Sequence, residues 1–344
     1  MNKDTLRIAI IGCGAVSQRC HIPAVQSHPD LRLEWLVDPD TQRLRQLTNE
    51  ADKVKTATDY HEVLGKADAA IVAAPHSLHA SISVDLLRHG IHVLVEKPMA
   101  SSVAECDAMI EAADEGKAVL AVGLMRRFVH SAHFARWAVQ SSLLGVVESF
   151  DFREGNVYSW PVESDFFFRK ETARGGVLFD TGAHTLDLLL WWLGEVEEAE
   201  YYDDSYGGVE ADCEVRLSMA SGARGLVELS RTRNLRNTAI IRGENAELEV
   251  GLRTNEAVLR SRDGSVGLAG LGLKSPEQNP VNQGFLDLFP LQIHDWIEAI
   301  QTGRTPSVPG TEGRRSVALI EACYGRRKPL ELPWMSPEKR GAAN

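Results

Sequence analysis

The sequence predicts a two-domain α/β protein, with a doubly wound parallel sheet first and an α+β domain on a mostly antiparallel sheet second. Two observations predict this fold. Short apolar runs alternate with helical patterns as far as Val122, and short strand-like runs with few helices between them follow. At roughly 150 residues per domain, a chain of 344 residues is long enough for two domains.

The apolar runs of the first third are as short as the strands of a parallel sheet that is covered on both faces. They are Leu6–Ile11, Leu31–Val37, Ala69–Ala74, Ile91–Val95 and Ala118–Val122. The segments between them have helical spacing, and they are Val16–His28, Asp40–Ala51, Leu78–His89 and Val103–Glu115. This alternation is typical of a doubly wound domain.

The remaining sequence favours strands that follow each other at short intervals. The expected strands are Val146–Glu154, Ala211–Ser218, Arg224–Ser230, Ala239–Ile241 and Glu247–Val250. Helices are expected at Asp180–Leu193, Phe285–Gln301 and Glu312–Tyr324, and a long loop at Gly264–Gly284 because Gly, Pro and Asn are frequent there. We therefore expect a cofactor domain over 1–124, a substrate and oligomerisation domain over 125–334, and a loose tail over 335–344.

Composition excludes several classes of protein. The net charge of −11 disfavours nucleic acid and anionic membranes as partners. The five cysteines are scattered and odd in number, which favours a reducing compartment over a disulfide framework. No apolar run is long enough for a membrane span or typical of a signal peptide, and no cluster has metal spacing. We expect a cytoplasmic protein without a metal.

A glycine loop follows the first expected strand, at Ile10–Ser17. Gly12 permits a tight turn, and Gly14 lets the backbone approach a pyrophosphate at the helix start, where Ala15 and Val16 lie. Ser17 replaces the usual third glycine. An ordinary turn between strand and helix is the alternative reading, but the position of the next acidic residue favours a dinucleotide site.

That acidic residue is Asp38, which ends the second expected strand. A carboxylate there accepts hydrogen bonds from the ribose 2′-hydroxyl and repels a 2′-phosphate, so it favours NAD over NADP. Arg43, five residues further on, would partly offset this repulsion.

Two further segments suggest chemistry. Lys97 follows the fifth expected strand, at the carboxyl edge where such sheets bind ligands. Asp180 and His184 are four residues apart, on one face of an expected helix. A solvated strand end, a helix-start carboxylate and a buried core histidine are the alternative interpretations.

With these motifs the chain resembles the glucose–fructose oxidoreductase, inositol dehydrogenase and rhizopine-catabolism (Gfo/Idh/MocA) oxidoreductases over nearly its whole length. The resemblance rests on the loop at Gly12, on Glu96-Lys97-Pro98, and on Gly175-Gly176 with Asp180, His184 and Asp187; it is supported by Pro75 with His79, Gly123 with Arg126-Arg127-Phe128, and Phe168-Arg169. It implies a Rossmann domain followed by a domain with an open, mostly antiparallel sheet. Arg174 and Met125 depart from the family pattern.

The resemblance also implies roles for individual residues. Lys97 resembles the family's general acid/base, Asp180 and His184 the substrate-facing pair of the proton path, and Arg126 the arginine beside the nicotinamide. The implied cofactor contacts are Gly12, Gly14, Ala15, Val16, Asp38, Arg43, Ala74, Pro75, His79, Glu96, Lys97 and Arg126. The implied substrate contacts are Lys97, Arg126, Tyr158, Trp160, Arg169, Asp180 and His184. The aromatic stretch with Tyr158 and Trp160 is equally consistent with a partly buried loop or a subunit contact.

We therefore expect an NAD-dependent oxidoreductase that interconverts a secondary alcohol and a ketone on a sugar, cyclitol or related polyol. The alternatives are a glycosidase that uses NAD for transient oxidation, and a non-catalytic sensor of dinucleotides. Because family members commonly cover the second-domain sheet with another subunit, a homodimer or homotetramer is expected.

Overall fold

The computed structural model describes residues 5–48, 53–159, 173–262, 264–270 and 285–331. Contacts between residues divide the chain into two compact units. The first unit holds the described residues up to Met125 and those from 285 to Val317, and the second holds the others. Residues 285–317, which the predicted boundaries assign to the second domain, thus pack with the first unit.

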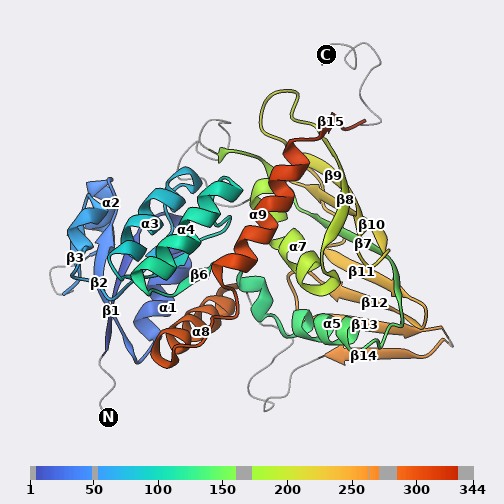
Figure 1. Cartoon of the computed structure of the whole chain (residues 1–344), viewed down its shortest axis with the longest axis horizontal. Helices are drawn as coiled ribbons and strands as arrows, with labels where there is room; N and C mark the ends of the chain where they lie inside the picture. Colours follow the sequence, from blue (N-terminus) through green and yellow to red (C-terminus); the bar gives the residue numbers. More distant parts are fainter. Residues whose placement is uncertain (1–4, 49–52, 160–172, 263, 271–284, 332–344) are drawn as a thin grey trace. The chain divides into compact units, whose positions relative to one another are not determined.

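The first unit is built on a parallel sheet with the strand order β3-β2-β1-β4-β5-β6 (Figure 1). Its strands are β1 (Leu6–Ile11), β2 (Leu31–Val37), β3 (Lys55–Ala57), β4 (Ala69–Val72), β5 (His92–Val95) and β6 (Leu120–Val122). The central strand β4 is buried at every residue, as its apolar sequence predicts. The doubly wound sheet is therefore confirmed.

Helices follow the strands as the spacing predicts. They are α1 (Ile22–Ser27), α2 (Thr41–Leu47), α3 (His79–Arg88), α4 (Val103–Gly116) and α8 (Leu288–Thr302). Within the unit α3 packs against α4, and α1 packs against α8 (Figure 1). A π-helical turn, Ser17–His21, precedes α1, so the predicted first helix forms in two parts.

The second unit is built on a nine-stranded sheet with the order β14-β13-β12-β11-β7-β10-β9-β8-β15. Its strands are β7 (Val147–Gly155), β8 (Val196–Asp203), β9 (Asp212–Met219), β10 (Arg224–Ser230), β11 (Thr238–Gly243), β12 (Ala246–Gly251), β13 (Glu256–Ser261), β14 (Val266–Gly270) and β15 (Arg327–Pro329). The pairs β7–β10 and β8–β15 are parallel, and the other neighbours are antiparallel. The predicted mostly antiparallel sheet is confirmed.

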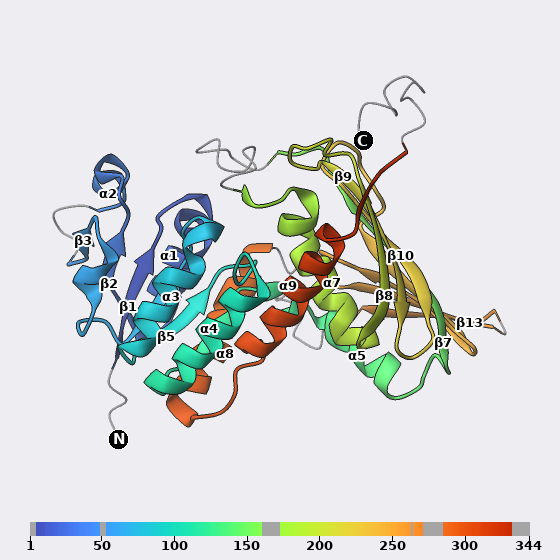
Figure 2. The same cartoon turned by 45° about the horizontal axis from the view of Figure 1, so that its top comes forward.

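Helices α5 (His130–Gln140) and α7 (Val177–Leu193) lie on one face of this sheet (Figure 2). Alternate strand residues point toward them: Phe152 of β7 is fully buried, and its ring lies 5.7 Å from the ring of Trp192 in α7. Helix α9 (Gly310–Tyr324) begins beside β6, where Pro309 pairs with Ala121.

The predicted loop Gly264–Gly284 is wrong in its first part, because Val266–Gly270 forms β14, hydrogen-bonded to β13. β14 is an edge strand that backbone hydrogen bonds hold, so its sequence needs no apolar alternation. Because glycine is uncommon in strands, the glycines of this segment predict a loop instead. Residues 271–284 and the tail 335–344 lie outside the described residues. In the part of the chain that the structure describes, no helix has both the length and the apolar character needed to cross a membrane.

Candidate active site

Four strand ends of the first unit lie at one edge of its sheet. The register pairs Ile11 with Val37 and with Val72, and Val72 with Val95. The residues that follow these strands therefore emerge side by side. They are Gly12 after β1, Asp38 after β2, Ala74 after β4, and Glu96 with Lys97 after β5. This is the edge at which doubly wound sheets bind ligands.

The glycine loop is shaped by the chain itself at Gly12. Its φ of +90° is a left-handed conformation, and a Cβ there would lie 2.5 Å from the carbonyl oxygen of Ala73. A Cβ on Gly14 would meet no atom within 4 Å. Packing within the chain therefore requires glycine at position 12 but not at position 14, which agrees with a role for Gly14 toward a ligand.

Ser17, which replaces the third glycine, stabilises this loop by a hydrogen bond. Its buried hydroxyl donates to the carbonyl oxygen of Gly12 over 2.5 Å. Ala15 and Val16 form the first helical turn before it. The departure from the glycine pattern thus adds a hydrogen bond and leaves the tight turn intact.

Asp38 is buried and joined to the glycine loop. Its carboxylate accepts hydrogen bonds from the backbone N–H groups of Cys13 (2.8 Å) and Asp40 (2.9 Å). Arg43 donates to both of its oxygens, at 3.0 and 3.1 Å. An acidic side chain held beside the loop fits the ribose of a dinucleotide.

The loop after β4 is tied to the loop that carries Lys97. The ring nitrogens of the buried His79 face the carbonyl oxygens of Ala74 (2.8 Å) and Pro98 (2.9 Å), and Pro75 precedes the 3₁₀ turn that leads to it. Burial lowers the pKa of His79. His79 connects the two loops, and its contact with a cofactor stays a prediction.

In the second unit, α7 carries Asp180 and His184, and its first turn is held by Glu210. One carboxylate oxygen of Glu210 accepts the N–H groups of Gly176 (2.8 Å) and Leu178 (3.2 Å). A Cβ on Gly176 would lie 1.8 Å from the carbonyl oxygen of Glu210. Gly176 is therefore required because the helix start packs directly on this backbone.

Arg231 holds Asp180. Its guanidinium donates to the Asp180 carboxylate over 2.8 Å and lies over the ring of Tyr158, 5.3 Å from the centroid. Burial and the charge of Asp180 raise the pKa of Tyr158. Arg231 was not among the residues predicted from the sequence, although its position directly after β10 was an available signal. Arg231 thus brings Tyr158 and Asp180 together, and the contact of these two residues with a substrate stays a prediction.

Arg126 forms a bidentate pair with the buried Glu154, at 2.7 and 2.8 Å. Thr185 and Arg253 also donate to Glu154, at 2.5 and 2.6 Å. Although burial favours the neutral carboxyl, the charges of Arg126 and Arg253 lower its pKa to about 2. The predicted contacts of Arg126 with cofactor and substrate stay predictions, because its guanidinium is paired within the unit.

Other predicted site residues are not brought together here. Trp160 and Arg169 lie outside the described residues. Lys97 belongs to the first unit and Asp180 and His184 to the second, so their meeting at one substrate stays a prediction. Among the described residues no cluster of His, Cys, Asp and Glu forms a metal site.

The fold and this edge define a class of protein. One edge of a doubly wound sheet carries three features: a glycine loop, an acidic residue after the second strand, and a lysine after β5. Together they indicate a nucleotide-dependent oxidoreductase.

Comparison with known proteins establishes the family. The model of the Gfo/Idh/MocA "oxidoreductase family, NAD-binding Rossmann fold" matches residues 6–124, and that of the family's "C-terminal alpha/beta domain" matches residues 144–329. The chain therefore belongs to the Gfo/Idh/MocA oxidoreductase family. It is an NAD-dependent dehydrogenase that acts on CH–OH groups.

Several relatives align over most of the chain. Myo-inositol 2-dehydrogenase of Thermotoga maritima is 23% identical, over 95% of this chain and 96% of its own. The scyllo-inositol 2-dehydrogenase (NAD(+)) of Bacillus subtilis is 27% identical over 88% of each chain. The crystal structure of aldose-aldose oxidoreductase from Caulobacter crescentus superimposes with a TM-score of 0.79 at 25% identity, covering 94% of this chain and 97% of that one.

Proposed function

We propose that this protein interconverts a secondary alcohol and a ketone on a sugar, cyclitol or related polyol. The observation that carries the proposal is the shared sheet edge, where Lys97 emerges beside the glycine loop and Asp38. The names of the relatives, two of which are inositol dehydrogenases, support a polyol as the substrate class. In this proposal residues 1–124 bind the cofactor, and residues 125–334 bind the substrate and a second subunit, in the cytoplasm.

Oxidation of the alcohol removes a hydride from carbon and a proton from oxygen. Bound NAD supplies the hydride acceptor. Lys97 takes the hydroxyl proton, and His184 shares or relays it. Asp180, held by the guanidinium of Arg231, orients the substrate hydroxyls as a hydrogen-bond acceptor. In the reverse direction the same lysine returns the proton to the carbonyl oxygen.

A panel of polyols, sugars and glycosides, screened by NADH absorbance, tests this function. Oxidation of a polyol or sugar with matching formation of NADH supports it. Release of free sugar from a glycoside without net NADH would identify the glycosidase instead, and dinucleotide binding without turnover of any compound would identify a sensor.

NAD(H) is expected to bind at least about tenfold more tightly than NADP(H), because a charge-assisted hydrogen bond from the ribose to Asp38 is worth about 1.5–3 kcal/mol. Asp38→Ala should narrow the ratio, since it removes the carboxylate and releases Arg43 toward a 2′-phosphate. Calorimetry with both cofactors measures the ratio. Asp40→Ala is the control, because Asp40 caps α2 through the N–H groups of Gln42 and Arg43. Tighter binding of NADP(H) by the unmodified protein would refute the preference.

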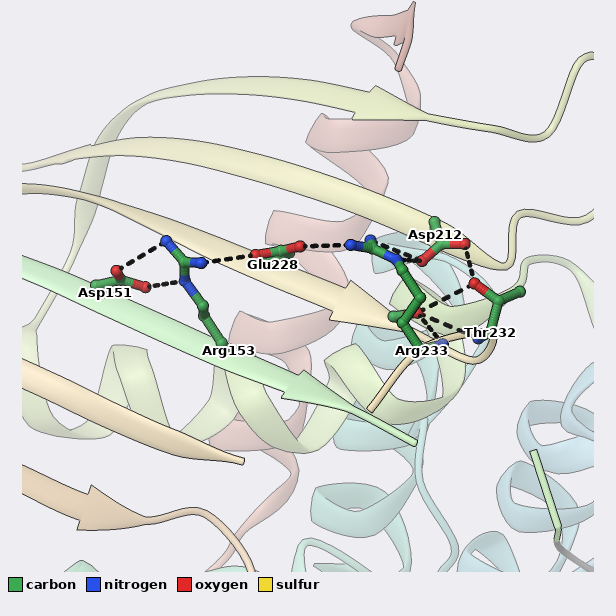
Figure 3. A network of polar contacts seen from close by, with 7 residues as sticks. Asp151, Arg153, Asp212, Glu228, Thr232 and Arg233 are labelled. Carbon is green, nitrogen blue, oxygen red and sulfur yellow. Dashed lines mark hydrogen bonds and ion pairs between the residues drawn. The ribbon is translucent and has the colours of Figure 1, made fainter. Parts of the chain in front are cut away.

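The second-unit sheet also supports an oligomer. The face opposite α5 and α7 carries a continuous network of ion pairs and hydrogen bonds on β7, β9, β10 and the turn that follows β10 (Figure 3). Its labelled members are Asp151, Arg153, Asp212, Glu228, Thr232 and Arg233. An antiparallel sheet commonly leaves one face to solvent, and members of this family commonly cover that face with another subunit, so we propose a homodimer or homotetramer through this face.

Sedimentation at micromolar concentration is expected to show at least a dimer, and a species of 37.9 kDa would contradict the proposal. Leu226→Asp should dissociate the assembly, because Leu226 pairs with Asp151 and therefore lies on the same face. The added carboxylate would be desolvated beside Asp151. Leu143→Asp, at an exposed position in the turn after α5, is the matched control and should leave the assembly unchanged.

A further inference from the structure

A buried histidine outside the predicted site contacts Glu96, the residue that precedes Lys97. His21 ends the π-helical turn that follows the glycine loop, and none of its surface is exposed. Its Nε2 lies 2.8 Å from Oε1 of Glu96, and the ring of Phe289 from α8 packs edge-on against it at 5.1 Å. His21 thus links the turn after β1 to the end of β5.

The carboxyl group of Glu96 is ionised. Although burial favours its neutral form, the hydrogen bond and charge of His21 and the charge of Lys97 hold its pKa below the usual value. Because the carboxylate only accepts, Nε2 of His21 carries the proton and donates. The other titratable groups that face Glu96 are the thiol of Cys20, whose pKa burial and Glu96 raise to about 12, and the imidazole of His79.

The second oxygen of Glu96 reaches Lys97. Oε2 accepts the backbone N–H of Lys97 over 3.1 Å, so one carboxylate binds His21 on one side and fixes the start of Lys97 on the other.

We propose that His21 is a positioning residue for the acid/base chemistry: through Glu96 it fixes the backbone from which the Lys97 side chain extends. The proposal rests on the proposed role of Lys97. Without the donor on His21, burial drives Glu96 toward the neutral acid, and the charge-assisted anchor of the Lys97 backbone is lost.

The first test needs neither substrate nor cofactor. Competitive acetylation of the full-length protein at one pH, followed by mass spectrometry of peptides, measures how readily the partly exposed Lys97 side chain reacts; the exposed Lys117 serves as internal standard. In His21→Met and in Glu96→Gln the acetylation rate of Lys97 relative to Lys117 is expected to change by about threefold or more, the effect of losing one hydrogen bond that holds its backbone. His21→Gln, whose amide nitrogen can replace Nε2 as donor, should restore it.

His92→Leu is the matched control. His92 begins β5 at the end opposite to Lys97, and its Nδ1 accepts the N–H of Val119 over 2.9 Å. This variant removes a hydrogen-bonded histidine from the same strand, so it should lower the melting temperature without changing the relative acetylation rate of Lys97. An unchanged rate in both His21→Met and Glu96→Gln, or an equal change in His92→Leu, would overturn the proposal.

The second test uses a substrate found by the screen. His21→Met should lower kcat by about tenfold or more, while KM and the dissociation constant of NAD stay within about threefold. His21→Gln should restore kcat. In a Lys97→Met background His21→Met should have no further effect. If Lys97→Met itself retains full turnover, the proposed function fails, whereas the labelling result still decides whether His21 controls Lys97.

Discussion

Replacing Lys97 by Met is expected to lower turnover by at least about a hundredfold, the lower end for loss of an acid/base group. Turnover should fall because Lys97 is the proposed proton-transfer group, at the sheet edge that also carries the glycine loop. NAD(H) binding should persist, because Gly12 and Asp38 are held by contacts that do not involve Lys97. Steady-state turnover and calorimetry with NAD measure the two effects separately.

Lys117→Met is the control, since Lys117 is an exposed lysine at the end of α4 and should be dispensable. His184→Ala should also lower the rate and alter its pH dependence. If both groups serve one proton path, the double variant should lose less than the product of the two single losses. Full turnover in Lys97→Met would remove the lysine from the mechanism.

The sequence predicts the first unit well because its signals are local. Apolar strands such as β1 and β2 agree with the structure to the residue, and fully buried runs between helices have few alternative folds. The elements that were not predicted are β3 in the first unit and α5, β8, β13, β14 and β15 in the second. β3 is three residues long, and β14 is rich in glycine, so partner strands rather than their own sequences determine them. The periodicity of α8 predicts a helix, but it does not indicate that this helix packs with the first unit.

For the site, the sequence indicates which residue types matter but not what holds them. Glycine spacing and strand ends place Gly12, Asp38 and Lys97 at one edge, because parallel strands share an edge. Arg231 and Glu210 were missed, because their contacts with Asp180 and the start of α7 span many residues. Arg127 and Asp187, which carry part of the resemblance, form a buried bidentate pair at 2.6 and 2.9 Å, so those positions serve packing.

Among the substitutions proposed here, breaking the buried pair of Arg126 and Glu154 is expected to lower the free energy of unfolding the most. Arg126→Leu removes the bidentate partner of a carboxylate with no exposed surface and leaves Glu154 with Arg253 and Thr185. Breaking a buried ion pair costs about 3–5 kcal/mol, and we expect the lower end of this range because Arg253 still pairs with Glu154. Arg7→Leu is the matched control, since Arg7 makes a similar two-contact pair with Asp68 at a partly exposed position of the first unit and should cost less than about 1 kcal/mol. Urea denaturation at neutral pH measures both.

The contribution of the same pair to stability should depend on pH. The pKa of Glu154 is about 2 in the folded protein, against 4.5 for the ordinary group. A depressed folded value stabilises the native state above the ordinary value, and this contribution, about 3 kcal/mol, is lost as the pH falls from about 4.5 to 2. The stability difference between the unmodified protein and Arg126→Leu should therefore narrow below about pH 4, because protonated Glu154 no longer needs the guanidinium. A difference that stays constant from pH 7 to pH 3, or a cost at neutral pH no larger than that of Arg7→Leu, would show that the pair does not stabilise the fold as a buried ion pair.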